Sequence, residues 1–228
     1  MNINPSYKIV TPLVSIYVLC LFLPTIDLHA TLTINLFFLS ISFPIPSLIF
    51  PAIYPISDSI TEVYGKKIAC FIVVSSYIVI ILFSFVNNTL LYFSHEKDLY
   101  EFILKKSILL TIIGPVAYFF TSLVNIFFIN RLKLYMRGKH FVLRSLICSA
   151  LSETIISFIV LSFVFYEKNI LSLIQIISST IIIKLIVTIP YVFIAKFLVI
   201  IYRRVDGIER SLYNKNFVIN SYNEAINE

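Results

Sequence analysis

Residues 54–88 read YPISDSITEVYGKKIACFIVVSSYIVIILFSFVNN. The second part of this stretch, residues 68–88, has no charged side chain and reaches the roughly 20 apolar residues that a helix needs to cross a membrane. The first part places Asp58 and Glu62 four residues apart, on one face of a helix, directly before two lysines. The uncharged run predicts a membrane-spanning helix, and the two carboxylates before it need a separate explanation.

The composition of the whole chain agrees with a membrane protein. Of the 228 residues, 59% are hydrophobic and 13% are charged, whereas a soluble domain has about a quarter charged residues. The net charge of +6 comes from short basic runs between apolar segments, unlike the continuous basic face of a nucleic-acid-binding protein. Cys20, Cys70 and Cys148 stand singly, so no disulfide framework or zinc site is expected. We expect an all-α, polytopic protein embedded in a lipid bilayer, with no nucleic-acid partner.

Six apolar segments predict the spans of one helix bundle: residues 8–26, 45–64, 68–88, 108–130, 142–166 and 171–202. The first is interpreted as a retained span, because it is long for a signal peptide and has no clear small-residue cleavage site. Between the first two spans, residues 31–42 (TLTINLFFLSIS) alternate polar and apolar side chains. They predict a connection that either lies along the membrane or forms a short extended segment.

The distribution of basic residues predicts the orientation of the spans. With both termini inside, the inner segments hold twelve Lys and Arg residues and the outer connections hold four. Because cytoplasmic loops carry an excess of basic residues, we expect both termini to be cytoplasmic. The membrane is expected to be the inner membrane of a bacterial cell. Residues 87–106 would be an outer connection with a short amphipathic helix. Residues 1–210 would form one transmembrane domain and residues 211–228 a polar cytoplasmic tail.

Several polar side chains fall inside the predicted spans. A charged residue at membrane depth costs about 2.5–3.5 kcal/mol on insertion scales, so such a residue normally faces the bundle interior. Four ionisable residues are candidates for this position: Asp58, Glu62, Glu153 and Lys184. Counted along helices, Asp58, Asn125 and Glu153 would lie about 10, 9 and 14 Å from the cytoplasmic boundary. If their helices face one another, these groups form one polar site.

Each of these residues also has a structural interpretation. Glu62 has a candidate interfacial partner in Lys66, at i+4, and Asp58 is a candidate cap or helix contact. Lys184 either snorkels outward or pairs with an acid inside the bundle.

Two prolines, Pro51 and Pro55, precede the acidic pair, and Tyr54 shares its helix face. Prolines free backbone carbonyls, which suits a binding site and also suits plain helix bending. The chain has no HExxH, P-loop or GxSxG motif, so we expect no catalytic residue, metal ligand or cofactor. An intramembrane enzyme is therefore the least favoured class.

The stretch FPAIYPISDSITEVYGKK, residues 50–67, resembles the signature of the queuosine precursor transporter family, also called vitamin-uptake-like transporters. The likeness extends over residues 43–202. It is carried by Phe50, Pro51, Asp58, Glu62, Tyr64, Gly65, Asn130, Arg131, Leu132, Arg144, Ser149, Ser152, Lys184, Pro190 and Tyr191. Two elements depart from the family pattern. The chain reads Ser122 to Asn125 where Gln-x-x-Asp is common, and Glu153 to Ile156 where Gln or Asn, then Asp, is common.

The resemblance implies a six-helix importer of 7-cyano- or 7-aminomethyl-7-deazaguanine, or of queuine, used for modifying transfer RNA. The implied substrate-binding residues are Tyr54, Asp58, Glu62, Asn125, Glu153 and Lys184. Asp58 or Glu153 would accept the adjacent N–H donors of the guanine-like edge, and Asn125 would meet a complementary group. Lys184 would be a charge partner or gate, and Glu62 would lie at the inner mouth.

Two alternatives remain open at this point. The chain is either a complete importer or the substrate-binding membrane subunit of a multi-component vitamin-type importer, and its solute is a deazaguanine or another small planar molecule. The sequence also leaves open the energy source and whether the protein forms a homodimer.

Overall fold

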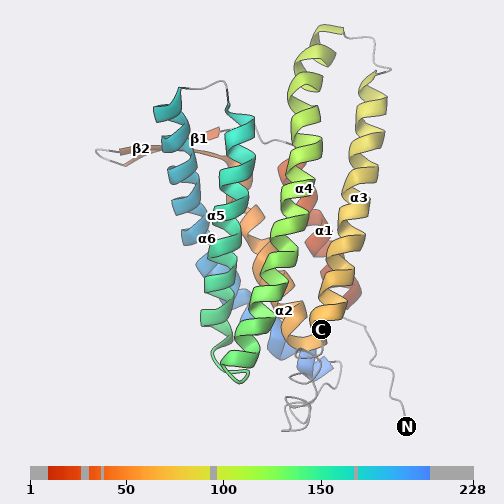
Figure 1. Ribbon diagram of the computed structural model, residues 1–228, viewed down its shortest axis with the longest axis vertical. Coiled ribbons are helices and arrows are strands. Elements are labelled where there is room, and N and C mark those ends of the chain that lie inside the picture. Colours follow the sequence, from red (N-terminus) through yellow and green to blue (C-terminus); the bar gives the residue numbers. More distant parts are fainter. Residues whose placement is uncertain (1–9, 27–30, 37–38, 93–96, 167–168, 206–228) are drawn as a thin grey trace.

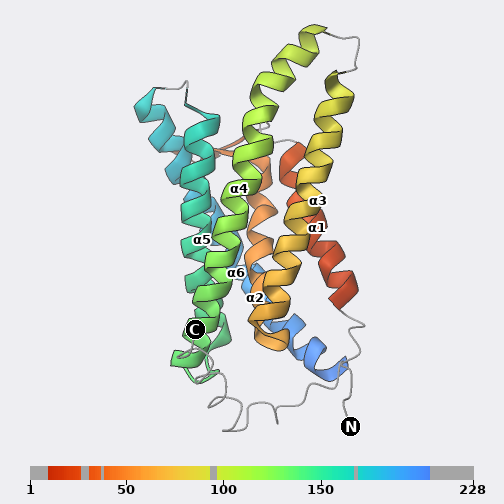
Figure 2. The same ribbon diagram turned by 45° about the vertical axis from the view of Figure 1, so that its right-hand side comes forward.

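Six α-helices lie side by side in one bundle in the computed structural model, which describes residues 10–26, 31–36, 39–92, 97–166 and 169–205 (Figures 1 and 2). The helices are α1 (Val10–Ile26), α2 (Ile53–Tyr64), α3 (Lys66–Tyr92), α4 (Lys97–Tyr135), α5 (Phe141–Val164) and α6 (Ile170–Val205). The predicted polar tail, residues 211–228, and the start of the first predicted span lie outside the described residues.

Four of the helices are long and apolar enough to cross a membrane. Their apolar parts are Lys66–Val86, Ile113–Tyr135, Phe141–Val164 and Ile170–Val205. The described part of α1 has 17 residues and α2 has 12, fewer than the roughly 20 of a complete span. The chain is thus a multi-pass helical membrane protein, and the first two of the six spans stay predictions, as does the cytoplasmic position of the termini.

The second predicted span, residues 45–64, is α-helical only from Ile53 onward. Its first part forms two 3-10 turns, η1 (Ile45–Leu48) and η2 (Phe50–Ala52), each with a proline in its first two positions. Proline has no N–H to donate and is tolerated where a helix begins. The prolines therefore shift the start of the α-helix and produce an irregular entry to α2.

At its other end, α2 stops at Gly65, whose φ of 86° lies in the region that favours glycine. The chain turns there, and α3 starts at the next residue. Lys66 therefore does not continue the helix that carries Glu62.

The connection after α1 is extended, which is one of the two forms that the alternation of residues 31–42 predicted. β1 (Thr31–Leu36) pairs antiparallel with β2 (Leu39–Pro44), in a register that aligns Leu36 with Leu39. β2 contacts α6, and the hairpin lies at the end of the bundle opposite the α4–α5 turn (Figure 1). The all-α prediction thus holds for the bundle, with a small hairpin added.

The prediction that residues 87–106 form an outer connection with a short helix is wrong in its length. α3 continues to Tyr92 and α4 already begins at Lys97, so two long helices replace a loop with a short helix, and both project beyond the other helices (Figure 1). The physical reason is that no glycine or proline occurs from residue 87 until Gly114. Between residue 87 and Gly114, neither helix therefore meets a residue that would interrupt its backbone hydrogen bonds.

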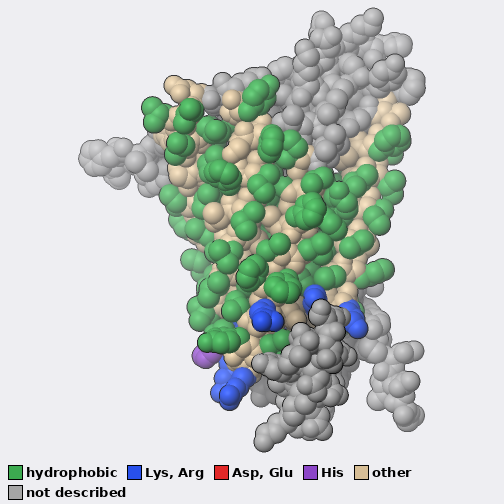
Figure 3. Space-filling model, in the orientation of Figure 1, with side chains coloured by type: hydrophobic (Ala, Val, Ile, Leu, Met, Phe, Trp, Pro, Cys, Tyr) green, Lys and Arg blue, Asp and Glu red, His purple; other side chains and the backbone are tan. Residues whose placement is uncertain are grey.

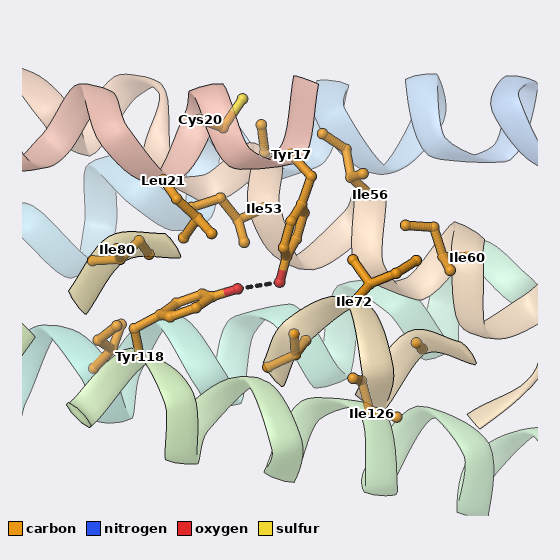
Figure 4. Close-up of a cluster of buried hydrophobic side chains, with 14 of the residues drawn as sticks. Tyr17, Cys20, Leu21, Ile53, Ile56, Ile60, Ile72, Ile80, Tyr118 and Ile126 are labelled. Atoms are coloured by element: carbon orange, nitrogen blue, oxygen red, sulfur yellow. Dashed lines mark hydrogen bonds between the residues drawn. The ribbon is translucent and has the colours of Figure 1, made fainter. Parts of the chain in front are cut away.

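α2 is the central helix of the bundle. Every residue from Ile53 to Glu62 is buried, and α2 contacts all five other helices. Around it, buried apolar side chains form a cluster in which the hydroxyls of Tyr17 on α1 and Tyr118 on α4 are hydrogen-bonded (Figure 4). Polar residues on the other faces of α2 are consequently held inside the protein.

The outer surface has the pattern of a membrane protein. On the face shown in Figure 3, hydrophobic side chains cover most of the described surface, and Lys and Arg gather at one end. Exposed basic residues at this end include Lys66, Lys67, Arg131, Arg137 and Lys139. This end also contains the α4–α5 turn.

Candidate functional site

The first polar centre is built around Asp58, in the middle of α2. The side chain is 0% exposed. Its Oδ1 accepts a hydrogen bond from Asn125 Nδ2 on α4 (2.6 Å). Its Oδ2 accepts one from Ser145 Oγ (2.6 Å) and a longer one from Ser149 Oγ (3.4 Å), both on α5. Hydrogen bonds to an ionised group are short and strong, so Asp58 links α2, α4 and α5.

This network continues toward the second acid. Asn125 Oδ1 accepts a hydrogen bond from Ser152 Oγ on α5 (3.2 Å). Ser152 is buried and directly precedes Glu153. Small serines let helices approach closely and donate across the interface, as expected between packed membrane helices.

The second centre is an ion pair between α5 and α6. Lys184 Nζ lies 3.5 Å from Glu153 Oε2 and donates to Ser157 Oγ at 2.9 Å. Glu153 is 0% exposed and Lys184 is 8% exposed, so Lys184 pairs with an acid inside the bundle and does not snorkel outward. An ion pair at this depth replaces the hydration that both groups lose.

Aromatic side chains flank the ion pair. The ring centroid of Phe50, in η2, lies 4.9 Å from Lys184 Nζ, which is a cation–π contact. Phe50 also packs edge-on against Tyr54 and Tyr118, with ring centroids 6.2 and 6.4 Å apart. The hydroxyl of Tyr54 is hydrogen-bonded to Thr121 Oγ1 on α4 (3.0 Å). Flat aromatic surface and polar groups are therefore adjacent.

The third centre surrounds Glu62, one turn after Asp58. Its Oε2 lies 3.1 Å from Arg144 Nη2 and 3.7 Å from Lys133 Nζ, and its Oε1 lies 3.3 Å from Arg203 Nη2. Lys133 also donates to the backbone carbonyl of Glu62 (2.9 Å). The carboxylate thus joins α2 to α4, α5 and α6 at the basic end of the bundle.

Lys66 has a different environment from the one its spacing suggested. It is exposed, and its ammonium lies 5.6 Å from the centroid of the Phe127 ring. The i+4 relation to Glu62 does not apply, because Gly65 ends α2 before Lys66.

The six predicted site residues fall into two groups. Five of them lie in the bundle interior, in two sets of contacts. Asp58 and Asn125 belong to the set that includes Ser152, and Glu153, Lys184 and Tyr54 belong to the set that includes Phe50. Ser152 directly precedes Glu153 in the sequence. Glu62 belongs to the separate cluster of basic residues at the bundle end.

Sequence reasoning missed the role of five residues that contact these acids or Lys184: Lys133, Arg144, Ser145, Ser157 and Arg203. Lys133 and Arg203 were counted only among the basic residues that predict the topology, and Arg144 was counted there and in the family resemblance. A usable signal existed for Arg144, because it falls inside the predicted span 142–166, where an arginine is expected to pair with an acid.

Comparison with known proteins agrees with this architecture. Residues 44–198 match the model of a protein family described as "Putative vitamin uptake transporter", and the chain belongs to this family. The resemblance to vitamin-uptake-like transporters is thereby confirmed, and the family is a class of transporters and not of enzymes. No curated protein and no solved structure matches the chain.

Proposed function

We propose that the protein is an importer of a guanine-type planar base, with 7-cyano- or 7-aminomethyl-7-deazaguanine or queuine as its solute. The observation that carries this proposal is the pair of buried carboxylates, Asp58 and Glu153, together with the Phe50 ring on the ammonium that pairs with Glu153. Small-molecule sites combine apolar and aromatic walls with a few placed polar groups. A guanine-like ring needs an aromatic face, a carboxylate for its N–H donors and a donor for its carbonyl.

The proposal includes the orientation and location of the protein. The basic end of the bundle, with Lys66, Lys67 and Arg131, would face the cytoplasm of a bacterial cell, since cytoplasmic segments carry the basic excess. Imported bases would then be available for transfer RNA modification. The alternative, a substrate-binding subunit of a multi-component importer, has the same site and differs in needing an energising partner.

Uptake by cells tests the substrate. In a strain unable to synthesise deazaguanines, cells expressing the chain are expected to accumulate a radiolabelled deazaguanine, and unlabelled precursors or queuine are expected to compete. Cells with the empty vector provide the background. Uptake at background level, with the protein present in the membrane, would contradict the proposed substrate. Uptake by the purified chain in proteoliposomes would exclude the subunit alternative.

Replacing Asp58 by Asn is expected to reduce this uptake by about tenfold or more. The amide has one acceptor and one donor group in place of two acceptors, so Asn125 or the serines of α5 lose their bond to a charged partner. The measurement is initial uptake rate per amount of membrane protein. Ser149→Ala is the matched control, because it removes only the 3.4 Å contact to the same carboxylate. Wild-type uptake by Asp58→Asn would remove Asp58 from the mechanism.

A further inference from the structure

The two interior carboxylates differ in how their oxygens are used. Asp58 accepts hydrogen bonds on both oxygens, from three side chains. Glu153 is equally buried, yet among the described residues its Oε2 has only the 3.5 Å ion pair with Lys184 and its Oε1 has no hydrogen-bond donor. A buried acceptor without a donor is costly, so Glu153 has the capacity to take donors from a ligand, whereas Asp58 has little capacity left.

Lys184 supplies hydrogen-bond donors next to the acceptor oxygens of Glu153. Its ammonium has three N–H donors, of which one reaches Ser157 Oγ at 2.9 Å. The nitrogen lies 3.5 Å from Glu153 Oε2. The two side chains therefore present, side by side, a donor followed by two acceptor oxygens.

One edge of a guanine-type base is complementary to this order of one donor and two acceptors. That edge carries a carbonyl oxygen, a ring N–H and an exocyclic amino group, which is acceptor, donor, donor. A hypoxanthine-type base lacks the amino group, and a uracil-type base has a second carbonyl at the same place. Of these three edges, only the guanine-type edge gives both oxygens of a carboxylate a donor while its carbonyl meets an ammonium.

We propose that Glu153 and Lys184 together read this edge, with Glu153 accepting the ring N–H and the amino group and Lys184 donating to the carbonyl oxygen. This assignment rests on the proposed function and deepens it by naming which candidate residue meets which atoms. Asp58 then holds α2, α4 and α5 together and does not itself contact the base. Glu153 becomes the residue that sets specificity for the 2-amino group.

Two further contacts support this position for the base. Phe50 lies over Lys184 Nζ at 4.9 Å and contacts Tyr54 and Tyr118, so an aromatic surface for a planar ring adjoins the pair. The pair itself is electrically neutral, which suits an uncharged heterocycle.

The test compares affinities for bases with and without the 2-amino group. The full-length purified protein in lipid nanodiscs is titrated with guanine, hypoxanthine and the 7-deaza forms of both. Wild-type protein is expected to bind the amino-bearing base of each pair about tenfold or more tightly, the range for a hydrogen bond to a charged group. Glu153→Gln is expected to bring the ratio close to one, because the amide keeps a single acceptor oxygen.

Two more variants separate recognition from folding. Glu153→Asp keeps a carboxylate and is expected to keep the preference at reduced affinity. Asp58→Asn is expected to change affinity for both bases by the same factor and to leave the ratio as in wild type. A merely structural role for Glu153 would lower both affinities together and leave the ratio unchanged.

The outcomes distinguish this inference from the proposed function. A wild-type preference that survives in Glu153→Gln, or that disappears in Asp58→Asn, overturns the assignment to Glu153 while leaving the base as substrate. Binding of guanine-type bases without deazaguanine uptake by cells overturns the proposed substrate alone. If the wild-type protein binds none of the four bases, both are wrong.

Discussion

Replacing Glu62 by Gln is expected to lower the free energy of unfolding by about 3–5 kcal/mol, the range for removing one partner of a buried ion pair. The carboxylate is 4% exposed and is the partner of Arg144, Lys133 and Arg203. Without it, three cations from three helices face one another. Arg144 on α5 is 0% exposed, so its charge would stay buried without a carboxylate partner.

The measurement is chemical unfolding of the purified protein in detergent. Arg131→Gln is the matched control for charge at this end of the bundle, because Arg131 is exposed, and a change within about 0.5 kcal/mol is expected. The double variant Glu62→Gln with Arg144→Gln is expected to recover part of the loss, since it removes the stranded charge together with its partner. A single variant as stable as wild type would show that Glu62 does not hold the four helices together.

The meeting of Asp58 with Asn125 illustrates what the sequence could predict. The similar depth of polar residues in three apolar spans indicated one polar site if these faces met, and in the structure Asn125 does donate to Asp58. The same argument left two outcomes for Lys184, and the structure shows the pair with Glu153. The depth of a residue can be counted along its helix, whereas the neighbour that each helix face meets depends on how the helices pack.

Glu62 shows where counting along the chain failed. Its spacing to Lys66 suggested a pair on one helix, but that rule requires an uninterrupted helix, and Gly65 ends α2 between the two residues. The true partners come from α4, α5 and α6, at distances in sequence that no local rule covers. Arg144 was missed because a basic residue near a span end has two explanations, and only tertiary packing distinguishes a topology signal from a buried partner.

The same limit applies to the lengths of the helices. Apolar stretches predicted α4 from residue 108, while the helix begins at Lys97. Hydropathy reports which residues suit a membrane, and helix ends are set by glycine, proline and capping, which need not coincide with it.

Lys184→Met is expected to lower the free energy of unfolding by about 3–5 kcal/mol, because it leaves Glu153 as an unpaired buried carboxylate that has no hydrogen-bond donor among the described residues. Lys196→Met provides a matched control on the same helix. Lys196 is exposed, so its replacement is expected to change stability by less than about 0.5 kcal/mol. Both variants are compared by chemical unfolding in the same detergent.

A double variant shows whether the cost comes from the stranded charge. Glu153→Gln combined with Lys184→Met removes both charges and is expected to recover most of the stability lost in Lys184→Met, because a neutral pair needs no compensation for lost hydration. If the loss in the free energy of unfolding of the double variant equals the sum of the losses of the two single variants, the two side chains act independently. In that case the 3.5 Å contact between α5 and α6 contributes nothing as an ion pair, and Lys184 is held by its bond to Ser157 and its contact with the Phe50 ring.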